Sequence, residues 1–250
     1  MKRSICILAI IATVFMVFLP VSVYAETYSF GGTDMSIDVD DSLWYVFTRD
    51  NIKDNSELKE LGISYNSMYD ILYTNEAYMD ALLLYEDGGF VELFVRKKPL
   101  EKGIVNLSNY EDAEVLDLAK AIAKKQGAET YSVYENQYKF AKLEYIDSNY
   151  GYYLCEFYTV VNKENYTLTF QKTSAYTDAE YEEMTKIVDS IRFDVDPTLK
   201  EEIHNSFLEN IFTETIGGAA IGAVIGGVVG AIIAIVNKKK KKDQNNAEPS

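Results

Sequence analysis

The chain has 250 residues and a formal net charge of −15, because 39 acidic side chains outnumber 24 basic ones. This balance excludes a broad nucleic-acid-binding surface, which needs clustered Lys and Arg residues to neutralise phosphates. One histidine and two cysteines also exclude a histidine-rich metal site and a multi-disulfide framework.

The chain begins with the pattern of a secretory signal peptide over residues 1–25. Two basic residues precede an apolar run over residues 5–19, and small residues occupy the two key positions before the predicted cleavage site at Ala25. An uncleaved membrane helix is the alternative. After cleavage Cys155 is the one remaining cysteine, so no internal disulfide can form, as in many exported bacterial proteins.

Residues 26–195 are predicted to form one extracytoplasmic α+β domain, which opens with two short strands. Residues 28–30 and 35–39 flank a Gly31-Gly32 turn, and the second stretch alternates apolar and polar side chains. Trp44 then lies in a dense apolar cluster. We expect it to fill the core at a strand end, and a surface-exposed binding aromatic is the alternative.

Two helices and a hairpin are predicted next. Residues 56–61 and 64–77 have partly helical apolar spacing, with Gly62 ending the first and Ser64 or Asn66 capping the second. Residues 79–85 and 90–97 are strands joined by an Asp-Gly-Gly turn. The alternation of the second strand separates two faces, one with Val91, Leu93 and Val95, the other with Phe90, Glu92, Phe94 and Arg96.

A longer helix, four strands and a closing helix follow. The helix covers about residues 111–126 and ends at Gly127. Strands near residues 130–134, 138–146, 151–161 and 166–171 are joined by short turns, which predicts an antiparallel meander. A capping-box pattern at Thr177 and Glu180 begins the last helix. The meander is rich in tyrosine, so an aromatic face that binds sugar or peptide is an alternative to ordinary strand packing.

The C-terminal part of the chain is predicted to anchor the domain. Residues 196–213 form a juxtamembrane helical stalk, residues 214–236 a transmembrane helix, and residues 237–250 a basic and then polar cytoplasmic tail. Five consecutive lysines set the topology with the C-terminus in the cytoplasm and can also bind anionic lipid: Lys238, Lys239, Lys240, Lys241 and Lys242. The part between the two membrane-associated ends carries a charge near −20.

The transmembrane segment has glycines at intervals of four residues. Gly218, Gly222, Gly226 and Gly230 therefore lie on one helix face, where a second helix can approach closely. This spacing favours a homo-oligomer or pairing with a partner helix. The alternative is a run of small residues in a weakly hydrophobic anchor.

The order of the predicted elements resembles the PsbP/DcrB-like α/β sandwich family. The resemblance is carried by the early strand that leads to Trp44 and by the closing motif Ile187-Val188-Asp189-Ser190-Ile191-Arg192-Phe193, and it covers about residues 28–193. It implies an antiparallel sheet covered by helices, in a small extracytoplasmic or accessory protein. The family has no shared catalytic set, so the resemblance implies no catalytic, metal or cofactor residue.

Few residues suit catalysis. His204, the single histidine, falls in the predicted stalk and is expected to be solvated, and Cys155 lies in a strand between large residues, where an inert thiol is expected. Glu92, Glu144 and Glu156 fall within strands and could meet as an acid pair, with cross-strand ion pairs as the alternative. A calcium site is a weak alternative at three acidic residues, Asp38, Asp40 and Asp41.

The sequence therefore predicts a single-pass bacterial membrane protein whose acidic α+β domain lies outside the cell and binds a protein or other ligand. It predicts no enzymatic activity, cofactor or metal. An accessory subunit that assembles through the glycine face is the first alternative, and a carboxylate-dependent surface hydrolase is the second.

Overall fold

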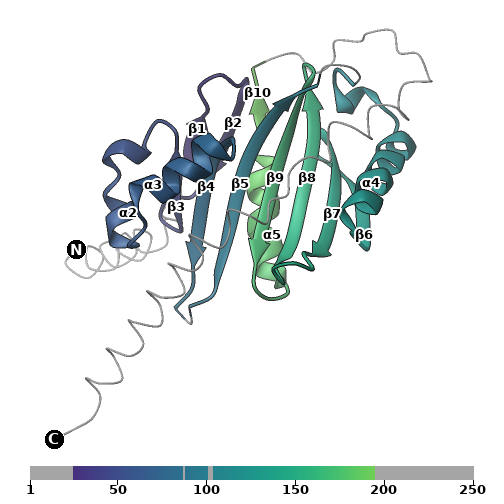
Figure 1. Ribbon diagram of the computed structural model, residues 1–250. Helices are drawn as coiled ribbons and strands as arrows, with labels where there is room; N and C mark the ends of the chain where they lie inside the picture. Colours follow the sequence, from purple (N-terminus) through teal and green to yellow (C-terminus); the bar gives the residue numbers. More distant parts are fainter. Residues whose placement is uncertain (1–24, 87, 101–103, 195–250) are drawn as a thin grey trace, which may run out of the picture.

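A seven-stranded antiparallel sheet dominates the computed structural model, which describes residues 25–86, 88–100 and 104–194 (Figure 1). The strand order is β3-β4-β5-β9-β8-β7-β6, so the set β3–β5 meets the meander β6–β9 where β5 pairs with β9. The strands are β3 (Trp44–Thr48), β4 (Ala77–Leu84), β5 (Phe90–Pro99), β6 (Thr130–Glu135), β7 (Lys139–Ile146), β8 (Tyr153–Val161) and β9 (Glu164–Lys172).

A second, three-stranded sheet joins the two ends of the domain. It consists of β1 (Glu26–Ser29), β2 (Met35–Val39) and β10 (Arg192–Phe193), in the order β1-β2-β10. The closing strand β10 pairs antiparallel with β2, and Arg192 forms a salt bridge with Asp38. The first and last described strands are therefore held together.

Seven helical segments connect the strands within the described ranges. They are η1 (Ile52–Asp54), α2 (Ser56–Glu60), α3 (Tyr65–Tyr69), the π-helical turn η2 (Asp70–Thr74), η3 (Leu107–Asn109), α4 (Asp112–Gln126) and α5 (Asp178–Asp189). Both longer helices begin with a capping box and carry acidic residues in the first turn. The positive end of the helix dipole stabilises these negative charges.

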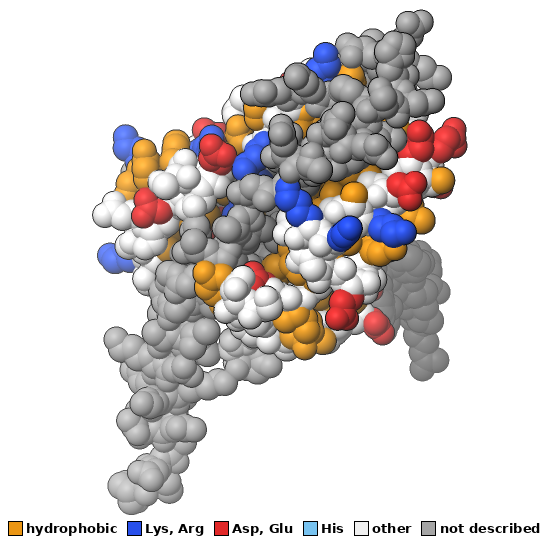
Figure 2. Space-filling model, turned by 45° about the vertical axis from the view of Figure 1, so that its right-hand side comes forward, with side chains coloured by type: hydrophobic (Ala, Val, Ile, Leu, Met, Phe, Trp, Pro, Cys, Tyr) orange, Lys and Arg blue, Asp and Glu red, His pale blue; other side chains and the backbone are white. Residues whose placement is uncertain are grey.

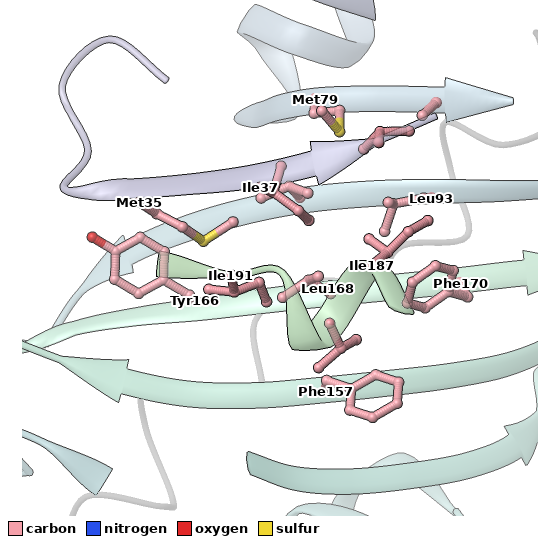
Figure 3. Packing of buried hydrophobic residues seen from close by; sticks show 14 of the residues in the cluster. Met35, Ile37, Met79, Leu93, Phe157, Tyr166, Leu168, Phe170, Ile187 and Ile191 are labelled. Atoms are coloured by element: carbon pink, nitrogen blue, oxygen red, sulfur yellow. The ribbon is translucent and has the colours of Figure 1, made fainter. Parts of the chain in front are cut away.

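One face of the large sheet holds the main core (Figure 3). Helix α5 and strand β2 pack over this face, so apolar residues of the helix and of both sheets interdigitate. The predicted alternation of β5 is confirmed, because Val91, Leu93 and Val95 all lie in this core. The residues drawn as labelled sticks are Met35, Ile37, Met79, Leu93, Phe157, Tyr166, Leu168, Phe170, Ile187 and Ile191.

The opposite face is covered by helices near its two sides. The α2–α3 region packs on β3 and β4 through one apolar cluster, and α4 packs on β6 and β7 through another (Figure 1). Between these clusters, strands β5, β9 and β8 carry buried polar side chains, including Glu92, Thr169 and Glu156. We call this strip, together with the adjoining Asp80 of β4 and Arg96 of β5, the polar band.

Most predicted elements are confirmed, and the predicted helix over residues 64–77 is the main error. Ser64 caps the helix as expected, but α3 ends at Tyr69 and continues as one π-helical turn. This wider turn places both Ile71 and Leu72 in the core, and Glu76 then adopts a φ of 57° that directs the chain into β4. Ala77 is therefore the first residue of β4.

The turn between β1 and β2 allows a matched test of backbone conformation. Gly32 has a φ of 78°, whereas Gly31 has no such positive φ, and a Cβ at either position would meet nothing within 4 Å. We expect Gly32→Ala to lower the free energy of unfolding by about 1–2 kcal/mol, because L-residues are strained there. Gly31→Ala is expected to be neutral or slightly stabilising. Urea unfolding followed by fluorescence of the single tryptophan measures both, and equal effects would contradict the assignment.

The predicted anchor is not among the residues that the structure describes. The stalk, the transmembrane helix and the basic tail all lie outside the described residues, as do residues 1–24 of the signal peptide. Within the described ranges, no helix has the length and apolar character needed to cross a bilayer.

Candidate functional site

An open cleft lies at one end of the large sheet, beside the N-terminus of α5. Its volume is about 570 Å³, which is within the usual range for ligand-binding pockets. Its walls come from the chain just before β3, the β4–β5 hairpin, the loop after β9 and the first turns of α5. The lining residues are Leu43, Leu83, Tyr85, Gly89, Phe90, Lys172, Thr173, Ser174, Ala175, Thr177, Ala179, Glu180 and Glu183. We call this site the α5 cleft.

The α5 cleft is mainly apolar and includes a buried ion pair. Lys172 Nζ lies 2.5 Å from Glu180 Oε1, and both side chains are less than a tenth exposed. Glu180 also accepts hydrogen bonds from the backbone N–H and the hydroxyl of Thr177, at 2.7 and 3.0 Å. Burial opposes ionisation, but the Lys172 ammonium and the Thr177 donors together lower the pKa of Glu180. The charges are mutually satisfied, so the cleft can accept an apolar group.

Exposed apolar side chains continue beyond the cleft. Leu43 lines the cleft and is 49% exposed, while Ile146 and Tyr150 are 54% and 48% exposed at the β7–β8 turn. Cross-strand pairing places Ile146 opposite Tyr153, and Tyr153 opposite Lys172. In the space-filling view, orange hydrophobic groups lie beside red acidic groups at the lower end of the domain (Figure 2).

The structure brings two of the three predicted glutamates to the polar band. Glu92 and Glu156 lie on the same face of the sheet and are 1% and 0% exposed. Glu144 pairs with Cys155 across β7 and β8, on the opposite face, where it accepts a hydrogen bond from Tyr181 and forms a salt bridge with Lys142. Glu144 therefore cannot form an acid pair with the other two glutamates.

The sequence prediction missed Asp80, which stands next to Glu92. Asp80 pairs with Phe94 and Leu82 pairs with Glu92, so the two acids occupy diagonal positions on neighbouring strands. Asp80 is fully buried. Among the described residues, neither oxygen of its carboxyl group has a hydrogen-bond partner with ordinary geometry. The available signal was a single acid within the apolar run Ala77–Leu84, at a position whose alternation points it inward.

The pKa values of Asp80 and Glu92 are both raised, and each carboxyl group influences the pKa of the other. Burial, and then the neighbouring Glu92 carboxylate, raise the pKa of Asp80 well above its ordinary value. Burial also raises the pKa of Glu92 to about 7, although the Gln171 amide and Asp80 stabilise its ionised form. Two buried carboxyl groups on neighbouring strands are compatible when one of them is protonated, because this removes the repulsion between two buried negative charges.

Glu156 is satisfied within the sheet. Its carboxylate accepts hydrogen bonds from Tyr158 at 2.5 Å, Tyr145 at 3.0 Å and Thr169 at 3.1 Å. Burial nevertheless raises its pKa. The positive charge of Arg96 acts to lower the pKa of all three acids of the band, Asp80, Glu92 and Glu156. Burial in turn lowers the pKa of the Arg96 guanidinium.

The remaining candidate site residues contribute to the structure of the domain. Trp44 is 2% exposed and its indole N–H points to Glu183 Oε1 at 3.4 Å, so the predicted core role is confirmed. Asp38 pairs with Arg192, and Asp40 accepts hydrogen bonds from Ser42. Over the described ranges, no group of three or more His, Cys, Asp or Glu residues is arranged to hold a metal ion.

The tyrosines of the meander do not form one aromatic face. Tyr138, Tyr158 and Tyr166 are buried, whereas Tyr150 is exposed. An exposed tyrosine row occurs instead on α3 and η2, where Tyr69 and Tyr73 stack with ring centroids 4.5 Å apart. Arg49 lies over the Tyr73 ring and over the Tyr78 ring, at 5.3 and 4.2 Å from their centroids. Tyr69 and Tyr73 remain 41% and 43% exposed, so the exposed tyrosine row lies on the helical segments and not on the meander.

Cys155 is expected to be unreactive in the folded domain. It is fully buried, and burial raises the pKa of its thiol to about 12, so almost no thiolate is present at pH 8. Maleimide is therefore expected to modify this residue only after urea is added, as measured by mass spectrometry of the peptide that contains it. A Tyr150→Cys variant, exposed at the β7–β8 turn, is the control. Labelling of both cysteines at similar rates in native buffer would contradict this prediction.

Comparison with known proteins assigns no family, because neither a family model nor a curated protein matches the chain.

Proposed function

We propose that this chain is a single-pass membrane protein of the bacterial cell surface whose acidic α+β domain binds a partner outside the cell. The signal-peptide pattern, the apolar segment over residues 214–236 and the lysine run support this topology. The antiparallel sheet flanked by helices agrees with the architecture implied by the PsbP/DcrB-like resemblance.

The α5 cleft is the observation that carries the binding role. It is open, mainly apolar and bordered by the exposed side chain of Leu43. The acids with the most perturbed pKa values, in contrast, are enclosed in the polar band and do not line the cleft. The cleft is accessible to a ligand, whereas the acids that could transfer a proton are not. Together these two features favour recognition over catalysis.

Chemical cross-linking on intact cells tests the proposed role. We expect the full chain to be recovered with a defined partner protein after cross-linking by a membrane-impermeant reagent. Protease added to whole cells is expected to digest the acidic domain while an intracellular control stays intact. Recovery of this chain alone, or protection of the domain from external protease, would contradict the proposal.

A second candidate is an accessory subunit that assembles in the membrane, and the glycine spacing favours it. Gly218, Gly222, Gly226 and Gly230 lie outside the described residues, so this role rests on the sequence. The double substitution Gly222→Ile and Gly226→Ile is expected to abolish association in a membrane two-hybrid assay and to preserve insertion. An unchanged signal would exclude this face as the contact.

A carboxylate-dependent hydrolase has less support. Its acid pair would be Asp80 and Glu92, which share one sheet face, but their exposed fractions are 0% and 1%. A substrate bond has to reach such groups within hydrogen-bond distance.

A further inference from the structure

We infer that the end of the domain around the α5 cleft binds an extended, basic peptide segment that places an apolar side chain in the cleft. This inference rests on the proposed binding function and adds the chemical class of the partner and its site. The shape of this surface, the spacing of its apolar groups and its charge support it.

The shape of the surface favours an extended chain. The cleft accepts one apolar group, and Ile146 offers a second apolar contact two strands away from Lys172. Neighbouring strands lie about 4.8 Å apart, so Ile146 is roughly 10 Å from Lys172 on the wall of the cleft. Side chains on one face of an extended peptide repeat every 6–7 Å or so, which lets residues a few positions apart reach both contacts. A compact small molecule would occupy the cleft alone.

The charge of the surface favours a basic partner. Lys172 is already paired with Glu180, whereas the Glu183 carboxylate faces the cleft with only long contacts, to Trp44 at 3.4 Å and Lys186 at 3.7 Å. The part of the chain between the signal peptide and the anchor carries a charge near −20. This field attracts cations and repels both anionic lipid and a second copy of the same domain.

The test uses the full chain in phosphatidylcholine vesicles and a fluorescein-labelled octapeptide, Lys-Leu-Ser-Lys-Ser-Leu-Lys-Ser, whose leucines are four positions apart and so lie on one face of an extended chain. We expect saturable binding by fluorescence anisotropy, with an affinity that falls as salt is added. Two control peptides replace every leucine by serine or every lysine by glutamate, and neither is expected to bind. Binding of the leucine-free peptide with unchanged affinity would show charge attraction only and overturn the site.

Substitutions at exposed residues can locate the peptide contact without destabilising the hydrophobic core. Ala179→Arg fills the cleft with a cation and is expected to weaken binding at least about tenfold. Leu43→Ser removes an apolar wall and should weaken it several-fold. Leu116→Ser is the matched control, because Leu116 is 41% exposed on α4, away from the cleft. Equal effects of Leu43→Ser and Leu116→Ser would overturn the inference.

A photo-crosslinking amino acid separates failure of this site from failure of the proposed function. Placed at position 43, it is expected to capture the cellular partner, and placed at position 116 it is not. Capture from position 69, on the tyrosine row, but not from position 43 would retain a binding function and move it to another surface. Phosphatidylcholine vesicles without protein provide the lipid control, and they are expected to bind no peptide.

Discussion

At pH 8 the Glu92→Gln variant is expected to be more stable than the wild-type chain by about 2–3 kcal/mol. The folded domain holds Glu92 at a pKa of about 7, compared with an ordinary value of 4.5. The folded state therefore retains a proton that the unfolded chain has lost, and stability falls as pH rises through this window. Each retained proton contributes about 1.4 kcal/mol per pH unit. Glutamine imitates the protonated acid and can donate a hydrogen bond to Asp80.

The direction of this effect is opposite to ordinary acid denaturation. The pKa values of Asp38 and Glu180 are lowered, by Arg192 in the first case and by Lys172 and Thr177 in the second. Those two groups lose their stabilising effect as pH falls below their ordinary values, whereas the polar band loses its effect as pH rises. Maximum stability is therefore expected at mildly acidic pH.

Urea unfolding from pH 5 to pH 9, followed by Trp44 fluorescence, measures the slope. Glu144→Gln is the matched control, because it removes a carboxylate from the same sheet on the opposite face. The chain has a single histidine, His204, so His204→Gln accounts for the other side chain that titrates near neutrality. A wild-type stability that does not decline between pH 5 and pH 7, or an equal gain from Glu144→Gln, would contradict a proton shared by Asp80 and Glu92.

The pair and the groups around it come from five strands. Asp80 lies on β4, Glu92 and Arg96 on β5, Gln171 on β9, Glu156 and Tyr158 on β8, and Tyr145 on β7. Burial, reinforced by the Glu156 carboxylate, raises the pKa of both tyrosines. Three acids thus face one guanidinium in a buried region, and this imbalance favours proton retention over full ionisation.

The periodicity of apolar residues and the residue types at turns were sufficient to predict most helices and strands from the sequence. The alternation in β5 and the Asp-Gly-Gly turn gave the hairpin, and Gly127, with a φ of 72°, ends α4 as expected. The π-helical turn after Tyr69 could not be predicted, because packing of Ile71 and Leu72 decides it. Local propensity does not contain that tertiary contact.

The candidate sites were harder to predict than the elements that build them. The α5 cleft joins residues from before β3, from the β4–β5 hairpin and from the β9–α5 loop, which are far apart in the sequence. The pairing of β5 with β9 decides that these segments meet. For the polar band, the sequence showed that Glu92 shares a face with Arg96, but only strand order places Asp80 beside it and Glu144 on the other face.

Lys172→Met is expected to lower the free energy of unfolding by about 3–5 kcal/mol at pH 7, the largest effect of any single substitution considered. Methionine fills a similar volume but leaves the Glu180 carboxylate buried without its cation. The double variant Lys172→Met with Glu180→Gln should recover most of the loss, because glutamine is neutral and retains the capping box with Thr177. A double-mutant cycle by urea unfolding therefore separates charge burial from lost packing.

The pH dependence of the single variant gives a second, independent readout. Without Lys172, burial is the dominant influence on Glu180, so its pKa should rise above the ordinary value in the folded state. The deficit of Lys172→Met relative to wild type is then expected to shrink as pH falls from 7 to 4, because the acid is protonated instead of buried as a charge. A deficit that is the same at both pH values, or that persists undiminished in the double variant, would mean that Lys172 acts through packing of its side-chain methylenes and that the ion pair beside the α5 cleft contributes little.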